Sequence, residues 1–166
     1  MSNEKWFTEL EGAGHGRTIR MDKVLVDVET PFQKLQIFEN ESVGRVMLLD
    51  GAVMLTQRDE YIYHEMLVHP ALLAHPAPKD VLVIGGGDGG TLREVVKHPA
   101  VERAVQCEID EEVMRYSREF MPFTACGLDH PKSEIVVGDA IEYVRQQQSS
   151  FDVIIVDSTD PVGFAE

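Results

Sequence analysis

Acidic residues stand just after four apolar runs in the second half of the chain. The four are Asp88, Glu108, Asp139 and Asp157. If the runs are parallel strands, these carboxylates lie at the strands' carboxyl ends, where α/β sheets bind ligands. Carboxylates that share a crevice repel one another and are costly to desolvate, so a cationic ligand or a metal ion would offset that cost. For Asp88 and Asp139, capping of the following helix is the simpler alternative and remains open.

A glycine-rich loop contains the first of these acids. Gly85, Gly87 and Gly90 match the GxGxxG pattern between an apolar run and a helix-forming run, the context of a nucleotide-binding loop. Asp88 lies inside this loop, which contains no Lys or Arg, so a pyrophosphate would be repelled. The loop therefore favours a positively charged nucleoside without phosphate, such as S-adenosylmethionine or a relative.

Two further acids have expected contacts with such a nucleoside. Glu108 follows Gly85 by 23 residues and ends a strand, where a carboxylate accepts hydrogen bonds from both ribose hydroxyls. Asp139 closes the next strand, where it or the amide of its neighbour Ala140 can contact the adenine amino group. A solvated strand end is the alternative for Glu108.

The elements that must position these residues begin near residue 57. Periodicity and turn residues predict helices over 59–74, 91–97, 110–120 and 140–147, and strands over 81–84, 101–109, 133–137 and 151–156. The stretch from Met121 to Pro131 is expected to be a loop. Alternating strands and helices require a parallel sheet with right-handed crossovers. We expect an α/β fold, with a Rossmann-like parallel sheet of the methyltransferase type, in a nucleoside-binding catalytic domain of residues 57–166.

Residues 1–56 are expected to form a small N-terminal antiparallel β domain. Short β-rich runs occupy 24–28, 35–38, 44–49 and 52–56 and predict a β-meander. The pair Asp50-Gly51 between two apolar runs is the best hairpin signal. Since this piece is too short to be stable by itself, it should pack on the next domain or on another subunit.

The helix expected over 59–74 precedes the glycine loop. The helix is indicated by apolar residues that recur at spacings of about three and four; they are Tyr61, Met66, Leu67, Leu72 and Leu73. Asp59 is the expected N-cap. By position alone, Tyr63 would be a core residue and His64 a surface residue of this helix.

Composition narrows the function classes. Fifteen basic against 29 acidic residues give a net charge of −14, which argues against a nucleic-acid partner. The acidity fits a solvated surface or attraction of a cationic substrate, and charge cannot separate these. No apolar run reaches 18 residues and the first residues lack a signal-peptide pattern, so we expect a cytoplasmic protein without a membrane partner.

Other catalytic motifs do not fit the chain. His64 and His69 are five residues apart rather than the four of HExxH, and no metal site is expected. The glycine loop lacks the lysine of a Walker A motif. Cys107 ends an apolar strand and is expected to be a buried small residue, and neither it nor Cys126 belongs to a CxxC pair.

Several motifs in order resemble the spermidine synthase family. They are LDGAVMLTQRDEYIYHEM, GGGDGGTLREVVKHP, QCEID, VGDA and DSTDP. The resemblance covers the chain from about residue 20. It implies a polyamine aminopropyltransferase, which transfers the aminopropyl group of decarboxylated S-adenosylmethionine to putrescine and yields spermidine and methylthioadenosine. The family implies no metal or other cofactor, with decarboxylated S-adenosylmethionine as co-substrate, and a homodimer or homotetramer.

The resemblance also implies roles for residues. Asp157 would be the base and Tyr63 would orient the attacking nitrogen. Asp88 would pair with the donor's ammonium group. The other implied contacts are His64 and Asp160 with the diamine, Gln33, Gly85, Gly87 and Glu108 with the nucleoside, and Asp139 and Ala140 with adenine. By position alone, Gln33 would be an ordinary strand residue. Phe164 stands where the family usually has proline.

Two alternatives remain open. A methyltransferase with the same fold would bind S-adenosylhomocysteine tightly, although Asp88 and the DSTDP motif argue against it. The chain also stops just after its fourth expected strand, whereas the family continues. We therefore expect the 57–166 domain to be incomplete at its C-terminal end, and an inactive fragment of a synthase is the second alternative.

Overall fold

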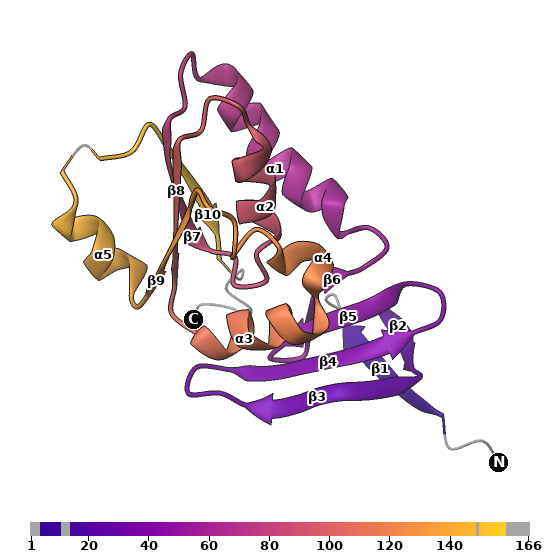
Figure 1. The fold of residues 1–166 in the computed structure, drawn as a ribbon. Coiled ribbons are helices and arrows are strands. Elements are labelled where there is room, and N and C mark those ends of the chain that lie inside the picture. The colour runs from indigo at the N-terminus through magenta and orange to yellow at the C-terminus, as the bar shows by residue number, and fades with distance from the viewer. Residues whose placement is uncertain (1–3, 11–13, 149, 159–166) are drawn as a thin grey trace.

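The computed structural model describes residues 4–10, 14–148 and 150–158, and it has the expected α/β fold. A β-rich N-terminal part precedes a parallel sheet with helices on both faces (Figure 1). The strands are β1 (Lys5–Leu10), β2 (Gly16–Met21), β3 (Lys23–Glu29), β4 (Lys34–Asn40), β5 (Gly44–Leu49), β6 (Ala52–Thr56), β7 (Asp80–Gly85), β8 (Arg103–Glu108), β9 (Ser133–Val137) and β10 (Val153–Asp157). The helices are α1 (Glu60–Ala74), α2 (Gly90–Lys97), α3 (Glu111–Phe120), α4 (Pro122–Ala125) and α5 (Ala140–Gln146). In the described part of the chain, no helix combines the length and apolar character needed to cross a membrane.

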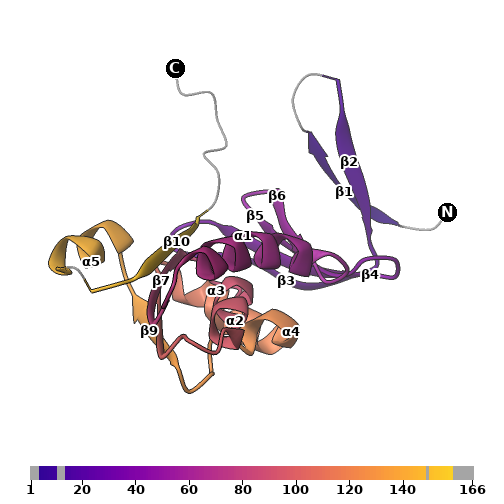
Figure 2. The same ribbon diagram turned by 90° about the horizontal axis from the view of Figure 1, so that it is seen from above.

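The N-terminal part contains the expected meander. Strands β3, β4, β5 and β6 pair antiparallel in sequence order. The predicted hairpin is confirmed, because Asp50 and Gly51 both have positive φ, 49° and 76°, between β5 and β6. This pattern is that of a two-residue turn that matches the strand twist. The β1–β2 hairpin forms a separate sheet that extends from the side of the meander (Figure 2), and its Phe7 and Ile19 pack against the core cluster that contains Phe38 of β4.

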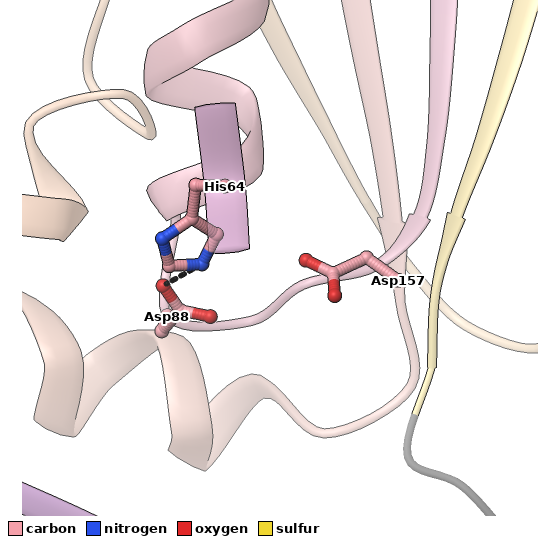
Figure 3. A group of neighbouring side chains, drawn as sticks. All are labelled: His64, Asp88 and Asp157. Carbon is pink, nitrogen blue, oxygen red and sulfur yellow. Dashed lines mark ion pairs between the residues drawn. The ribbon is translucent and has the colours of Figure 1, made fainter. Parts of the chain in front are cut away.

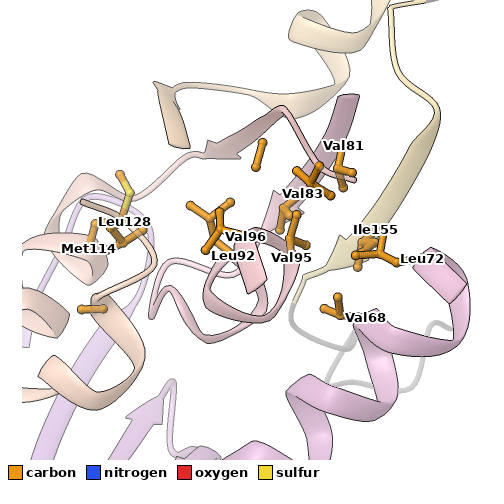
Figure 4. Packing of buried hydrophobic residues seen from close by; sticks show 13 residues of the cluster. Val68, Leu72, Val81, Val83, Leu92, Val95, Val96, Met114, Leu128 and Ile155 are labelled. Atoms are coloured by element: carbon orange, nitrogen blue, oxygen red, sulfur yellow. The ribbon is translucent and has the colours of Figure 1, made fainter. Parts of the chain in front are cut away.

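The parallel sheet has the strand order β10-β7-β8-β9. Helices α1 and α2 lie on one face and α5 on the other (Figure 2). The core on the first face joins Val68 and Leu72 of α1, Leu92 and Val95 of α2, and the sheet residue Ile155 (Figure 4). On the second face, three buried sheet residues contact α5; they are Leu82, Val105 and Cys107. Cys107 is therefore the buried residue expected from the sequence.

Helix α3 joins the two sheets. Its Met114 belongs to the core of the parallel sheet, whereas Val113 packs with Val26, Leu35 and Met47 of the antiparallel sheet. The antiparallel sheet thus packs on the next domain, one of the two expected outcomes. It borders the parallel sheet's strand ends, where ligands of such folds bind.

One local expectation was wrong. A short helix, α4, occupies part of the predicted loop; Pro122 suits its first turn, where no amide hydrogen is needed. Asp59 is the N-cap residue of α1, as predicted, but its side chain accepts a hydrogen bond from Thr56 Oγ1 at 2.6 Å instead of from an amide of the helix.

The apolar residues whose spacing predicted α1 do not form its buried face. Leu72 is buried, but Tyr61, Met66 and Leu73 are exposed, and the other buried residues are Glu60, His64 and Val68. Apolar residues lie on both sides of this helix, so spacing alone did not decide which side faces the core. The face of α1 that packs on α2 begins with the polar residues Glu60 and His64.

Candidate functional site

The carboxyl ends of the parallel strands lie in a row. Asp157 ends β10, Gly85 ends β7, Glu108 ends β8, and Asp139 follows β9. Neighbouring strands are about 4.8 Å apart, so the outer two strand ends are separated by roughly 14 Å. The sequence led us to expect that the four acids share one crevice. In the structure they do not meet at one point. They divide into an Asp88–Asp157 pair at one end and Glu108 farther along the row.

The glycine loop brings Asp88 beside Asp157. Gly85 and Gly86 have positive φ angles of 79° and 72°, and the Gly86 amide donates to the Asp157 carbonyl oxygen at 2.8 Å. A Cβ atom on Gly85 would lie 2.3 Å from that oxygen. The loop thus needs glycine at position 85 for both its backbone conformation and its contact with β10.

Both carboxylate oxygens of Asp157 accept hydrogen bonds from hydroxyl groups. Tyr63 Oη donates to Oδ1 at 2.8 Å, and Thr91 Oγ1 donates to Oδ2 at 2.6 Å. Burial raises the pKa of Asp157, and the negative charge of Asp88 raises it further. A carboxylate that is held in place, with a raised pKa, is suited to accept a proton from a ligand.

Asp88, the second acid of the Asp88–Asp157 pair, faces His64. His64 Nε2 lies 3.4 Å from Asp88 Oδ1 (Figure 3), and the Gly90 amide donates to the same oxygen at 2.8 Å. Asp88 therefore binds the first amide of α2, which is close to the simpler role that the sequence left open, although the N-cap position itself is Gly89.

The structure reverses what position alone indicated for two neighbours on α1. Tyr63 was expected in the core but is 53% exposed, while His64 was expected on the surface but is 2% exposed. Their rings contact edge to face, with centroids 5.3 Å apart. The reversal follows from the packing of α1, whose polar buried face points toward the glycine loop.

Glu108 is held by backbone amides. The Asp110 amide donates to Glu108 Oε1 at 2.9 Å, and Gly87 lies so close that a Cβ on it would be 3.1 Å from Oε2. Burial raises the pKa of Glu108, although hydrogen bonds from three backbone amides partly oppose this. At 8% exposure it is not the solvated strand end that was the alternative.

Gln33 reaches this corner from the antiparallel part. It lies in the loop before β4 rather than within a strand, and its Nε2 donates to Asp110 Oδ2 at 2.9 Å. Thr30 Oγ1 donates to the same oxygen at 2.7 Å. Gln33 and Glu108 therefore both bind Asp110, from opposite sides of the domain junction.

The remaining predicted residues lie at the margins. Asp139 is exposed and caps α5, accepting a hydrogen bond from the Ile141 amide at 2.7 Å, and Ala140 is the first residue of that helix. Capping, the alternative left open for Asp139, is thus confirmed. The predictions for Asp160 and Phe164 fall outside the described residues.

Three residues of the site were missed by the sequence analysis. Thr91 directly follows the glycine loop, so its place next to that loop was a usable signal. Glu60 precedes His64 by four residues, a spacing that puts both on one helix face. Arg93 Nη1 lies 2.8 Å from Glu60 Oε1. No pattern in the sequence pairs these two residues, because they lie on different helices.

Two groups of side chains are close enough to share a metal ion. Within each group one ligand atom per residue lies within 4.8 Å of the others; the groups are His64, Asp88 and Asp157 (Figure 3), and Glu65, His69 and Glu94. In the first, both ring nitrogens of His64 already face carboxylates. In the second, Glu94 is already paired with Arg93 and Lys97. In each group at least one residue is thus already paired with other side chains, which disfavours a metal ion at either place.

Comparison with known proteins identifies the family. A model of the spermine/spermidine synthase domain matches residues 60–166. The chain belongs to the spermine/spermidine synthase family. A second model, of the spermidine synthase tetramerisation domain, matches residues 5–57.

Relatives in this family are similar over almost the whole chain. A polyamine aminopropyltransferase from Desulforudis audaxviator is 49% identical over 158 residues, which are 95% of this chain and 58% of the relative. A spermidine synthase from Schizosaccharomyces pombe is 48% identical over 163 residues, 97% of this chain and 55% of the relative. The chain thus spans little more than half the length of these family members.

Solved structures of spermidine synthases have the same fold. One, in complex with the transition-state analogue AdoDATO, superposes with a TM-score of 0.92 at 48% identity, over 95% of this chain and 54% of the other. The enzyme from Thermotoga maritima gives a TM-score of 0.90 at 47% identity, over 93% of this chain and 54% of the other. The fold and the family expected from the motifs are therefore confirmed.

Proposed function

We propose that the protein is a polyamine aminopropyltransferase, which transfers the aminopropyl group of decarboxylated S-adenosylmethionine to putrescine. The observation that carries this proposal is the close Asp88–Asp157 pair beside the glycine loop. Both substrates are cations, and two partly buried carboxylates are stabilised when cations bind between them. The family membership supports the same reaction.

The donor's nucleoside would occupy the Glu108 corner. Glu108 would accept hydrogen bonds from the ribose hydroxyls, and Gln33 would contact the nucleoside from the opposite side of the junction. Asp139 and the Ala140 amide would contact adenine, next to β9. The close approach of Gly87 to Glu108 supports this assignment, since it places the backbone of the glycine loop beside the carboxylate that would bind the ribose.

Asp88 would select the decarboxylated donor. Its Oδ1 accepts from Gly90 and faces His64, while Oδ2 accepts no hydrogen bond within the described residues. The donor's ammonium group would bind there. Ordinary S-adenosylmethionine would bring its carboxylate to the same place, where Asp88 would repel it.

Asp157 would start the transfer by accepting a proton from putrescine. An alkylammonium has a pKa of about 10, so the attacking nitrogen must be deprotonated before it can react. The freed amine then attacks the carbon attached to the sulfonium, the carbon–sulfur bond breaks, and its electron pair stays on sulfur, releasing neutral methylthioadenosine. The raised pKa of Asp157 makes it a better proton acceptor, and Tyr63 would orient the nitrogen.

The proposal includes no metal or other cofactor, because a sulfonium is a good leaving group without assistance. Asp160 would hold the rest of the diamine, whereas His64, whose two ring nitrogens already face carboxylates, would act on it through Asp88. We further propose a homodimer or homotetramer that uses the N-terminal β part, supported by the match of residues 5–57 to a tetramerisation domain. A cytoplasmic location stays a prediction from the sequence.

The test is incubation of the protein with decarboxylated S-adenosylmethionine and putrescine, followed by mass spectrometry. Methylthioadenosine and spermidine in equal amounts are expected. S-adenosylhomocysteine formed from S-adenosylmethionine and an acceptor would instead indicate a methyltransferase. Binding of methylthioadenosine without turnover would indicate an inactive fragment, and absence of both binding and turnover would contradict the proposal.

A further inference from the structure

Half of the buried face of α1 is polar. Glu60 is 7% exposed and His64 is 2% exposed, while Val68 and Leu72 continue the same face with no exposure. Apolar side chains at the first two positions would avoid the desolvation of ionisable groups. The polar pair adjoins the Asp88–Asp157 site, so a role in that site would explain it.

Glu60 is fixed by a two-pronged bond from α2. Arg93 Nη1 and Nη2 donate to Glu60 Oε1 and Oε2 at 2.8 and 3.0 Å. The guanidinium cannot swing away, since it also donates to the Phe123 carbonyl and to Glu94, both at 2.7 Å. Such a bidentate pair holds the carboxylate in one orientation.

Glu60 in turn holds the ring of His64. Glu60 Oε2 lies 2.5 Å from His64 Nδ1, and Asp88 Oδ1 lies 3.4 Å from Nε2. A ring with both nitrogens at carboxylate oxygens can donate to both only when it is protonated on both. Gly90 closes a further side, because a Cβ there would lie 2.3 Å from the ring.

Charged groups reach His64 from each element around it. They are Glu60 on α1, Arg93 on α2, Asp88 in the glycine loop and Asp157 at the end of β10. Burial by itself would lower the pKa of His64, but the Asp88 and Glu60 carboxylates raise it to about 10. The carboxylates thus favour the imidazolium form.

We propose that Glu60, clamped by Arg93, is a positioning residue that keeps His64 doubly protonated against Asp88 Oδ1. Asp88 is thereby turned so that its second oxygen points toward Asp157 (Figure 3). The second oxygen is the one that binds the substrate's ammonium group, a part of the inference that rests on the proposed function. Glu60 itself touches no substrate and acts through His64.

The direct test is an NMR pH titration of the protein with isotope-labelled histidine. The signal of His64 is assigned as the one lost in His64→Gln. In the wild-type protein this ring is expected to stay doubly protonated above pH 8. In Glu60→Gln its titration midpoint is expected to fall by at least about one pH unit. Glu65→Gln, the same change at an exposed position on α1, is the matched control and is expected to titrate like the wild type.

A singly protonated His64 ring in the wild-type protein at pH 7.5 would overturn the proposal without any variant. An unchanged midpoint in folded Glu60→Gln would overturn it as well. Arg93→Lys keeps the charge but removes the fork, so a smaller decrease of the midpoint is expected.

Kinetics test the second half of the proposal. Glu60→Gln is expected to raise KM for the decarboxylated donor about tenfold, with kcat changed less. Equal changes in kcat and KM, or none in either, would contradict the positioning of Asp88. The NMR titration needs no turnover, so failure of the aminopropyl transfer assay leaves its outcome interpretable.

Discussion

The two ends of the strand-end row hold their carboxylates in different ways. Glu108 is bonded by backbone amides, two from the residues that directly follow it, Ile109 and Asp110, and one from Gly87 in the glycine loop. Asp157 is bonded by the side chains of Tyr63 and Thr91, 94 and 66 residues away in the chain. The Glu108 corner is built by backbone amides of two strand-end turns, and the Asp157 corner by side chains of separate elements.

This difference has consequences for function. Backbone amides of a strand–turn–helix unit are fixed by the fold, so the Glu108 corner is suited to constant recognition of one nucleoside. The Asp88–Asp157 corner depends on side chains from α1, α2 and β10, whose charges influence one another. We expect substitutions at Glu108 to affect binding alone and substitutions at the other corner to affect several properties together.

The largest effect is expected for Asp157→Asn. The amide cannot accept the amine's proton, so kcat should fall by about 10²–10⁴, the usual contribution of a general base. Methylthioadenosine affinity, measured by calorimetry, should stay within about twofold. Asp129→Asn, at an exposed site on the surface, is the control. An equal loss of methylthioadenosine affinity would contradict the view that the Asp157 corner acts in the chemistry and the Glu108 corner in nucleoside binding.

A smaller effect is expected for Asp88→Asn, which removes the charge that we propose binds the donor's ammonium group. Hydrogen bonds to charged groups contribute about 1.5–3 kcal/mol, so KM for the decarboxylated donor should rise about 10- to 100-fold. Inhibition constants for ordinary S-adenosylmethionine should change less. The preference for the decarboxylated donor over S-adenosylmethionine should therefore decrease. Unchanged selectivity would argue against a role of Asp88 in donor choice.

Glu108→Gln should weaken methylthioadenosine binding about tenfold with kcat nearly unchanged. Glutamine keeps an acceptor for the Asp110 amide, so the melting temperature should change little. Glu119→Gln, exposed on α3, is the control. A large decrease of kcat without a change in affinity would show that this corner is coupled to the chemistry.

The free energy of unfolding is also expected to change with pH. Because the pKa of His64 is raised in the folded protein from its ordinary 6.5 to about 10, its charge stabilises the fold fully below pH 6.5. That contribution is lost as pH rises toward 10, with a slope of at most about 1.4 kcal/mol per pH unit. Urea unfolding at several pH values should show this decrease in the wild type and a flatter curve in His64→Gln. Equal slopes would mean that His64 gains no proton affinity on folding.

Much of the fold could be predicted because its signals are local. The glycine loop, the Asp50-Gly51 hairpin and the cap at Asp110 each depend on residues within a few positions of one another. The strand-end position of Glu108 follows from the same short patterns. The short helix α4 was missed because its four residues carry no periodicity.

The side chains of α1 could not be predicted in the same way. Tyr63 and His64 are adjacent, and both sides of the helix carry apolar residues, so the pattern permits either face to be buried. The contact between α1 and α2 decides which face is buried, since Arg93 of α2 binds Glu60 and Glu60 binds His64. Tyr63 is then left at the open side, next to Asp157.

The amino-acid sequence by itself determined the α/β class, the charged loop and the strand ends that carry the acids, because short-range periodicity and turn chemistry specify them. Only the tertiary structure decided which acids act together. Asp88 and Asp157 form a pair because β10 lies beside β7 and the Gly86 amide binds the glycine loop to the Asp157 carbonyl, while Glu108 ends β8 on the other side of β7. Strand order and helix packing are long-range properties, and they decide the distances on which the chemistry of this site depends.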